Sequence, residues 1–257
     1  MCKDSGKSIN FDLVADLYDA YVQTDLDIGF YAALCEGHDP ILELMCGTGR
    51  VSLPLLRAGC HMTCVDYSGR MLDVFRSKLS GNERVRIIQQ DITGLELNER
   101  FDLAFIPFHS IAEIILAQKR AAAIARIYDH LNPGGAFFLS LYNPAYRIRM
   151  ADGAEHVLGS FIMPDGRMLK VRYCNEYVPA KGLIRGEQAY EIRDKNDALL
   201  ETRRLDICFS VVEKEEVLLA AQSAGFTLKQ IYGDYARNPY TPESMFMHFL
   251  FERPAKS

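Results

Sequence analysis

The sequence predicts a doubly wound α/β fold, built on a mainly parallel sheet of seven strands with an antiparallel β insertion after the fifth strand. Short apolar runs alternate with helix-like segments between residues 40 and 141, which is typical of a parallel sheet with helical crossovers. After Asn143-Pro144 the pattern changes to strand-like segments joined by turns, and alternation resumes near residue 214. The composition, with 49% apolar and 25% charged residues, is that of an ordinary folded domain.

The first part of the chain predicts a helical cap and five β units. Residues 9–34 space apolar and aromatic side chains such as Phe11, Leu17 and Tyr18 along one helical stripe. Each apolar run that follows ends at a turn or a helix start, so we expect parallel strands joined by right-handed crossovers. The predicted strands are 40–44, 61–65, 85–89, 103–106 and 136–141, and the predicted helices are 51–58, 68–79 and 111–131.

The second part predicts hairpins and then a return to the main sheet. Turn signals such as Pro164-Asp165-Gly166 separate four strand-like segments, which indicates an antiparallel insertion. Such a sheet could cover a substrate or pair with a second copy of the chain in a homodimer, and the sequence favours neither. The predicted strands of the insertion are 157–163, 168–177, 183–192 and 199–211, followed by a helix at 214–224 and strands at 226–232 and 245–251. The predicted organisation is a cap at 1–36, an α/β domain at 37–145 and 211–257, and the insertion at 146–210.

Charge and cysteine usage exclude several classes of protein. The chain has 29 basic and 34 acidic residues, a net charge of −5, and no long basic run, which disfavours a nucleic-acid partner. No stretch of about 18 residues stays apolar and uncharged, and the start has no leader pattern, so we expect no membrane partner. Seven scattered cysteines without a C-x-x-C pair predict reduced thiols in the cytoplasm and no metal site.

A glycine loop follows the first predicted strand and indicates a ligand that contains adenosine. Gly47 and Gly49 stand where the backbone must turn tightly at the carboxyl edge of the sheet, and Asp66 ends the second strand, where a carboxylate can bind ribose hydroxyls. Both a nicotinamide dinucleotide and S-adenosylmethionine contain adenosine. A dinucleotide motif would have a third glycine where Ser52 stands, whereas Glu43 supplies the acidic residue near the strand end that S-adenosylmethionine favours.

Several motifs together resemble the class I methyltransferase family, in the order and spacing of that family. The resemblance covers residues 16–141 and implies a Rossmann-like fold, S-adenosylmethionine as cofactor, and methyl transfer to a small-molecule acceptor. One residue departs from the family pattern, since the family usually has glycine at the place of Met45. The motifs are Ile41-Leu42-Glu43-Leu44-Met45-Cys46-Gly47-Thr48-Gly49-Arg50, Val65-Asp66-Tyr67-Ser68 with Met71-Leu72, Gln90-Asp91-Ile92, Phe101-Asp102-Leu103, Leu131-Asn132-Pro133-Gly134-Gly135 and the later Ala224-Gly225-Phe226.

The resemblance implies a role for each residue that matches the family's cofactor site. Gly47 and Gly49 would line the methionine part of the cofactor, with Met45 and Cys46 in the same loop. Tyr18 would close over the cofactor or the substrate, although packing in the core explains it equally well. Arg50 would bind the cofactor carboxylate or stay on the surface of its helix. The remaining roles are Glu43 near the methionine end, Asp66 on the ribose, Tyr67 and Met71 on either side of the adenine, Asp91 and Ile92 at its amino edge, and Pro107 and Phe108 beside the sulfonium.

Methyl transfer from a sulfonium needs alignment more than it needs reactive side chains. A base is required only where the acceptor atom carries a proton that must leave. His109 follows the fourth strand and is the candidate base, and a buried structural histidine is the alternative. The sequence therefore predicts methyl transfer to an oxygen or nitrogen of a small molecule. Its rivals are a nicotinamide-dependent oxidoreductase and a non-catalytic module that binds S-adenosylmethionine.

Overall fold

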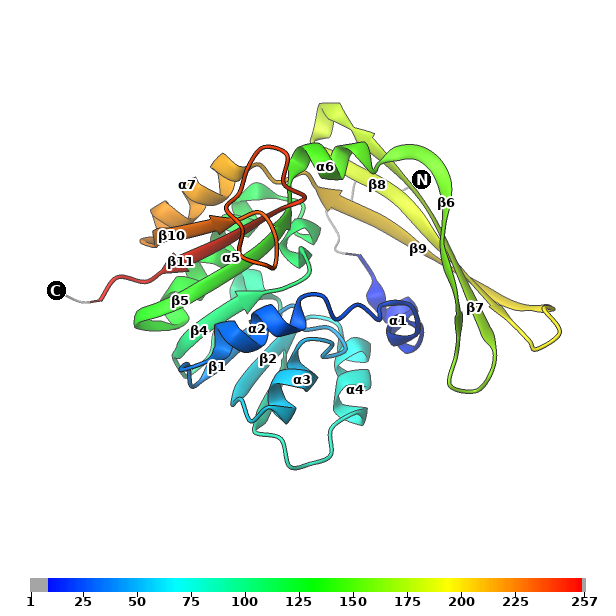
Figure 1. Ribbon diagram of the computed structural model, residues 1–257, viewed down its shortest axis with the longest axis horizontal. Coiled ribbons are helices and arrows are strands. Elements are labelled where there is room, and N and C mark those ends of the chain that lie inside the picture. The colour runs from blue at the N-terminus through cyan, green and yellow to red at the C-terminus, as the bar shows by residue number, and fades with distance from the viewer. Residues whose placement is uncertain (1–8, 256–257) are drawn as a thin grey trace.

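The computed structural model describes residues 9–255, and its main sheet confirms the predicted fold class. The strands of this sheet are β1 (Ile41–Leu44), β2 (Met62–Asp66), β3 (Val85–Gln89), β4 (Phe101–Ile106), β5 (Leu131–Tyr142), β10 (Thr227–Tyr232) and β11 (Phe246–Glu252). They lie in the order β10-β11-β5-β4-β1-β2-β3 (Figure 1). Strands β1 to β5 are parallel, whereas β11 runs antiparallel to both β5 and β10.

Helices cover both faces of the sheet. They are α2 (Ile28–Cys35), α3 (Ser52–Arg57) and α4 (Gly69–Ser77) on one face, and α5 (Ala117–His130) and α7 (Lys214–Ala224) on the other, with the short helix η2 (Ile92–Gly94) beside α5. Because both faces are covered, β1 and β2 are buried at every position, as their nearly continuous apolar sequence requires. In the part of the chain that the structure describes, no helix is long and apolar enough to span a bilayer.

The helix predicted at 111–131 is wrong in one respect, because the chain breaks it into two pieces. The short helix η3 (Ser110–Glu113) ends before α5 begins at Ala117. Between them, the guanidinium of Arg120 donates to the carbonyls of Ile114 and Ile115, at 2.5 and 3.1 Å. A side chain thus binds carbonyls that a continuous helix would bond to its own N–H groups. The break allows Glu113 to face a cavity.

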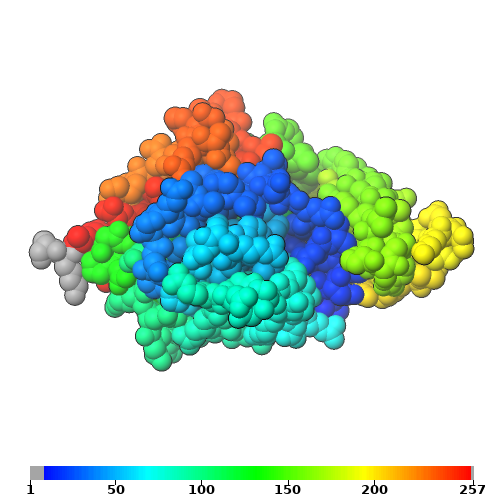
Figure 2. Space-filling view, turned by 60° about the horizontal axis from the view of Figure 1, so that its bottom comes forward, coloured from blue at the N-terminus to red at the C-terminus, as the bar shows by residue number. Residues whose placement is uncertain are grey.

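An N-terminal segment packs between the α/β part and the insertion. It comprises η1 (Phe11–Leu13) and α1 (Ala15–Tyr21), and α1 contacts α4 on one side and the insertion on the other. Figure 2 shows this segment in dark blue beside the insertion, whose tip projects past it. The N-terminal segment therefore joins the two parts of the molecule.

The insertion is a four-stranded antiparallel sheet with two different faces. Its strands are β6 (Asp152–Ile162), β7 (Met168–Val178), β8 (Leu183–Arg193) and β9 (Leu199–Ser210), with a short helix η4 (Pro179–Lys181) between β7 and β8. The inner face packs on the N-terminal segment through Val171, Tyr190 and Ile207, which are buried with Val14 and Leu17. Alternation along each strand sends the polar residues between them to the outer face. The first strand begins five residues earlier than predicted at 157, at Asp152.

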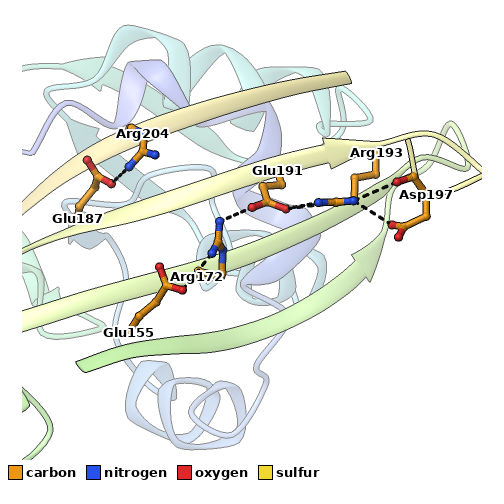
Figure 3. Close-up of polar contacts among 7 residues, drawn as sticks. All are labelled: Glu155, Arg172, Glu187, Glu191, Arg193, Asp197 and Arg204. Carbon is orange, nitrogen blue, oxygen red and sulfur yellow. Dashed lines mark hydrogen bonds and ion pairs between the residues drawn. The ribbon is translucent and has the colours of Figure 1, made fainter. Parts of the chain in front are cut away.

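The outer face of the insertion carries a network of ion pairs across its strands (Figure 3). Arg172 on β7 contacts Glu155 on β6 at 3.0 Å and also Glu191 on β8. Glu191 in turn accepts from Arg193 at 2.8 Å, and Arg204 on β9 pairs with Glu187 on β8. Exposed pairs of this kind contribute only about 0–1 kcal/mol each. A charged face of this kind suits contact with water, so the apolar inner face is the one that covers the rest of the molecule.

A short helix that the sequence analysis did not predict lies directly after β5. It is α6 (Pro144–Arg149), which leads into the insertion. Asn143 caps it, since the side-chain oxygen accepts from the backbone N–H of Ala145 at 3.1 Å, and Pro144 occupies the first helical position. The Asn-Pro pair that marks the change of pattern in the sequence is therefore a helix start.

Candidate active site

One cavity of about 450 Å³ lies at the carboxyl edge of the main sheet. The ends of β1, β2, β4 and β5 form its floor, the N-terminal segment forms one wall, and the inner face of the insertion forms the other. The volume falls in the range of sites for small molecules. Of the residues expected to bind the cofactor, seven line this cavity: Tyr18, Met45, Gly47, Asp66, Tyr67, Met71 and Phe108. His109, the candidate base, lines it too.

Asp66 is fixed at the end of β2 by two backbone groups. One carboxylate oxygen accepts from the N–H of Gly47 and the other from the N–H of Ser68, each at 2.8 Å. Burial raises the pKa of Asp66, and these two N–H groups oppose the rise. Each oxygen keeps a free lone pair, so the carboxylate can still accept hydrogen bonds from a ribose.

Gly49 has a different purpose from Gly47. Gly47 has a φ of +55° and lines the cavity, as expected for a residue that lets a ligand approach the backbone. Gly49 does not line the cavity, and a Cβ added there would lie 2.4 Å from the ring of Phe75 on α4. The second glycine is therefore required by the packing of α4 against the loop, and its expected role at the methionine part of the cofactor stays a prediction.

Met45 has a backbone conformation that favours glycine. Its φ is +57°, in the left-handed region, and its side chain lines the cavity. This conformation gives a physical reason for glycine to be usual at this place among similar sequences. In this chain the loop accepts backbone strain and gains an apolar side chain at the cavity wall.

Arg50 is already paired. Its guanidinium makes two hydrogen bonds of 2.6 Å to the carboxylate of the buried Asp27, and a third of 3.0 Å to the carbonyl of Thr24. The guanidinium also lies 4.6 Å from the centroid of the Phe108 ring. Arg50 does not line the cavity, so it ties the glycine loop to the chain before α2 and is not placed to hold a cofactor carboxylate.

Other expected cofactor residues lie behind the cavity wall. Glu43 is buried and accepts from the hydroxyl of Ser52 at 2.5 Å, and burial raises its pKa to about 8. Asp91 lines a smaller neighbouring pocket, where its carboxylate caps η2 by accepting from the N–H of Thr93 at 2.8 Å. Cys46, Ile92 and Pro107 line neither space. These residues support the wall, and only Asp91 reaches a neighbouring opening.

Tyr18 lies where the N-terminal segment meets the cavity. Its ring packs edge-on against Phe11 and Tyr21, at 6.0 and 5.5 Å between centroids. Burial raises its pKa above the ordinary value, so the hydroxyl stays protonated at neutral pH. Within residues 9–255 this hydroxyl has no hydrogen-bond partner, so it is available to a ligand.

His109 lines the cavity with a neutral ring. Its Nδ1 lies 3.2 Å from the hydroxyl of Ser140, and its ring lies 3.8 Å from that of Tyr142 and 5.2 Å from that of Phe246, between centroids. Burial among these rings lowers the pKa of His109 well below its ordinary value. A neutral imidazole can accept a hydrogen bond at any pH near neutrality, but its protonated form is costly here.

The cavity is also lined by two ionisable side chains that the sequence analysis missed. Glu113 lines both the cavity and the smaller pocket, and burial together with the nearby Asp66 raises its pKa to about 8. Arg147 on α6 lines the opposite end. The signals for both were weak, because Glu113 fell inside a predicted helix and Arg147 in a segment without a predicted element. Asn143-Pro144 could have predicted the helix that presents Arg147.

The charges of the cavity fit S-adenosylmethionine better than a dinucleotide. Asp66 and Glu113 lie at the end near the glycine loop, and Arg147 is the one lysine or arginine among the residues found to line the cavity. A pyrophosphate beside the loop would face the Asp66 carboxylate without a cation. A sulfonium with an adenosine would instead meet acidic groups and the apolar side chains of Met45 and Met71.

Comparisons with known proteins agree with this chemistry. A family described as methyltransferase domain matches residues 41–135. The cypemycin N-terminal methyltransferase of a Streptomyces species is 28% identical over 213 residues, which is 83% of this chain and 82% of that protein. The CcbJ methyltransferase of Streptomyces caelestis superposes with a TM-score of 0.77 at 23% identity, over 96% of this chain and 99% of that chain. The sugar N-methyltransferase KedS8 of a Streptoalloteichus species gives 0.74 at 19% identity, over 92% and 91%.

The two solved structures share the fold, and the family match covers the strands and loops that build the acidic end of the cavity. This match and the similarity along most of a known methyltransferase favour a methyltransferase over the nicotinamide-dependent and non-catalytic alternatives. In sequence and in fold the chain is similar to S-adenosylmethionine-dependent methyltransferases.

Proposed function

We propose that this protein transfers a methyl group to an amine nitrogen of a small molecule in the cytoplasm. The observation that carries the proposal is the continuous cavity of about 450 Å³ that joins the glycine loop to the inner face of the insertion. A cavity with these walls suits a small acceptor. One similar protein is named as an N-terminal methyltransferase of cypemycin and another as a sugar N-methyltransferase, which supports nitrogen over oxygen. The free thiols of the six described cysteines support the cytoplasmic location.

The end of the cavity near the glycine loop would hold the cofactor. We assign the ribose hydroxyls to Asp66, the faces of the adenine to Tyr67 and Met71, and the methionine part to the backbone of Gly47 with the side chain of Met45. When bound, S-adenosylmethionine supplies a methyl group already activated on a sulfonium. The protein therefore needs mainly to orient the acceptor and exclude water.

The other end of the cavity would hold the acceptor beneath the insertion, which then serves as a lid. Tyr21 on α1 and Tyr190 on β8 share a hydrogen bond of 3.0 Å between hydroxyls, which ties the lid to the N-terminal segment. We assign His109 to the acceptor nitrogen, as a neutral ring that accepts its N–H and leaves the lone pair free to attack. Tyr18 lies between the two ends, where its hydroxyl can bind either ligand.

The first test is calorimetric titration of the purified protein with S-adenosylhomocysteine, NAD and NADP, with Asp66→Ala as the control. We expect saturable binding of S-adenosylhomocysteine alone, and its loss in the variant. A panel of amines and alcohols with S-adenosylmethionine then follows, with product detection by mass spectrometry. Methylated amines support the proposal. Methylated alcohols alone would overturn the nitrogen assignment, and dinucleotide binding would overturn the proposal as a whole.

A further inference from the structure

The acceptor end of the cavity contains a half-buried cation without an anion. The guanidinium of Arg147 lies 5.2 Å from the ring centroid of Tyr142 and 4.8 Å from that of Phe209 on β9. In the described part of the chain no carboxylate pairs with Arg147, and its guanidinium donates no hydrogen bond. Burial lowers the pKa of this side chain, which reflects the cost of a desolvated charge.

Arg120 and Arg50, two other arginines with little exposed surface, each pair with a carboxylate. Arg120 is 4% exposed, pairs with Glu216 at 2.7 Å and donates to the Ser210 hydroxyl at 2.8 Å. Arg50 pairs with Asp27 through both of its terminal nitrogens. Buried charges in proteins are normally paired in this way. The rings of Tyr142 and Phe209 cover part of the Arg147 guanidinium but accept no hydrogen bond from its edge. The five N–H groups along that edge are therefore free to bind a ligand.

A second unsatisfied group lines the same cavity. Asn175 on β7 is 9% exposed, and its Oδ1 is buried without a hydrogen-bond partner among the described residues. A buried acceptor that lacks a donor costs about 1–3 kcal/mol. A turn of the Asn175 side chain toward the cavity, where a ligand donates an N–H or O–H to it, would remove this cost. The insertion thus contributes an acceptor, and α6 contributes a cation.

We propose that the acceptor molecule carries a free carboxylate, which the guanidinium of Arg147 binds, together with an N–H or O–H group that Asn175 accepts. This inference rests on the proposed function and gives its substrate class, an amino acid or a compound that ends in one. The planar guanidinium matches a carboxylate through two parallel hydrogen bonds.

The charge of the cavity favours a carboxylate over a phosphate. Arg147 is the one lysine or arginine found along the wall, and the carboxylic acids of Asp66 and Glu113 lie at the other end. One cation balances the single charge of a carboxylate, whereas a phosphate dianion would remain partly uncompensated. The centroid of the Tyr142 ring lies 5.2 Å from the guanidinium of Arg147 and 3.8 Å from the centroid of the His109 ring. A small molecule can therefore place its carboxylate by Arg147 and its amine by His109.

The experiment compares acids with their esters. A panel of L-amino acids and dipeptides, each as the free acid and as the methyl ester, is incubated with S-adenosylmethionine and either the wild-type protein, Arg147→Gln or Arg147→Lys. The matched control is Arg149→Gln, on the same helix, since Arg149 is exposed and lies 5.2 Å from the Tyr146 ring. Thermal unfolding with S-adenosylhomocysteine and each panel compound reports binding without turnover.

We expect free acids to be bound and methylated in preference to esters. In Arg147→Gln, KM for the acid should rise on the order of 100-fold with kcat less affected, Arg147→Lys should be intermediate, and Arg149→Gln should resemble the wild type. Binding of S-adenosylhomocysteine should stay unchanged in all three variants, which shows that each is folded. Equal use of acids and esters, stabilisation by phosphorylated amines alone, or no binding of any free acid would overturn the carboxylate assignment. Loss of S-adenosylhomocysteine binding in the wild type would instead overturn the proposed function.

Discussion

At the scale of single residues, Asp66 illustrates how a carboxylate can be held and still bind a ligand. Both of its oxygens accept a backbone N–H, from Gly47 and from Ser68. An amide has one oxygen only, so Asp66→Asn would set an NH₂ group against one of these donors. This geometry makes the carboxylate irreplaceable even by a side chain of the same shape.

We therefore expect Asp66→Asn to weaken S-adenosylhomocysteine binding by about 10-fold or more, and to lower the free energy of unfolding by about 1–3 kcal/mol. Calorimetry and urea unfolding measure the two effects. Asp73→Asn is the matched control, because Asp73 lies on α4 with its carboxylate exposed. Unchanged affinity in Asp66→Asn would show that the carboxylate does not bind the cofactor.

Glu113 predicts a pH dependence of stability. Its folded pKa is about 8, against an ordinary value of 4.5, so between these values the folded protein binds more protons than the unfolded chain. The titration of Glu113 therefore lowers the free energy of unfolding as the pH rises from about 5 to 8. Glu113→Gln removes the titration. Relative to the wild type, the variant should gain about 1–3 kcal/mol of stability between pH 5 and pH 8.

Urea unfolding without ligand at the two pH values measures this gain. Glu215→Gln on α7 serves as control, since its carboxylate is exposed beside Lys214. A variant whose stability tracks that of the wild type at both pH values would contradict the burial of a titrating carboxyl at this site.

At position 45 we expect a glycine variant to be more stable than an alanine variant, which reverses their order in a helix. In a helix, glycine is about 1 kcal/mol less stable than alanine, as Ala122→Gly in the exposed face of α5 should show. At Met45, with φ at +57°, alanine carries the strain of the left-handed conformation and glycine does not. Met45→Gly should therefore be more stable than Met45→Ala by about 1 kcal/mol in urea unfolding. The opposite order would contradict the conformation of the loop.

At the scale of elements, the N-terminal segment and the insertion depend on each other. The Tyr190 hydroxyl lies 3.0 Å from that of Tyr21 on α1 and donates to Gln188 on its own strand at 2.6 Å. The rings of Tyr21 and Tyr190 also meet edge-on, at 5.4 Å between centroids. These contacts stabilise the insertion without using the main sheet.

Tyr190→Phe keeps the ring contact and removes both hydrogen bonds. We expect a loss of about 1–2 kcal/mol of stability and faster amide hydrogen exchange in β7, β8 and α1, with little change in α5. Arg204→Gln on the outer face removes an exposed ion pair and should leave exchange in α1 unchanged. Exchange that rises equally in all elements would mean that the lid does not open as a unit.

At the scale of the whole molecule, the sheet brings opposite charges to the two ends of one cavity. The carboxyl edges of β1 and β2 supply Asp66 and the glycine loop, and the segment after β5 supplies Arg147. Ligands for the two ends can therefore be recognised by charge as well as by shape.

Cofactor binding should stabilise the whole fold. A ligand at about 100 times its Kd adds about 2.7 kcal/mol, which for a chain of this size raises Tm by about 5–10 °C. Thermal unfolding with S-adenosylhomocysteine should show this shift in the wild type and in Arg147→Gln, and a smaller one in Asp66→Asn. NAD should give no shift, and a shift with NAD of equal size would contradict the charge argument.

The sequence by itself determined the alternation of strands and helices, the glycine loop and Asp66. These features depend on residues close together in the chain, where periodicity and turn chemistry act directly. The helix break at Ile114 could not be predicted in this way, because it depends on the carbonyl bonds that Arg120 forms in the folded chain. The helix after Asn143 had a local signal in the Asn-Pro pair. The strand-like pattern that follows this pair led us to predict no helix there.

Only the tertiary structure decided which side chains enter the cavity. Gly49 serves the packing of Phe75, and Arg50 is held by Asp27, 23 residues earlier in the chain. Among the described residues, Tyr142 and Phe209, from β5 and β9, lie against Arg147 and no acid pairs with it. Such neighbours are set by strand order and by packing between distant segments, and a sequence pattern records the type of a residue but not the charge that it will meet in the fold.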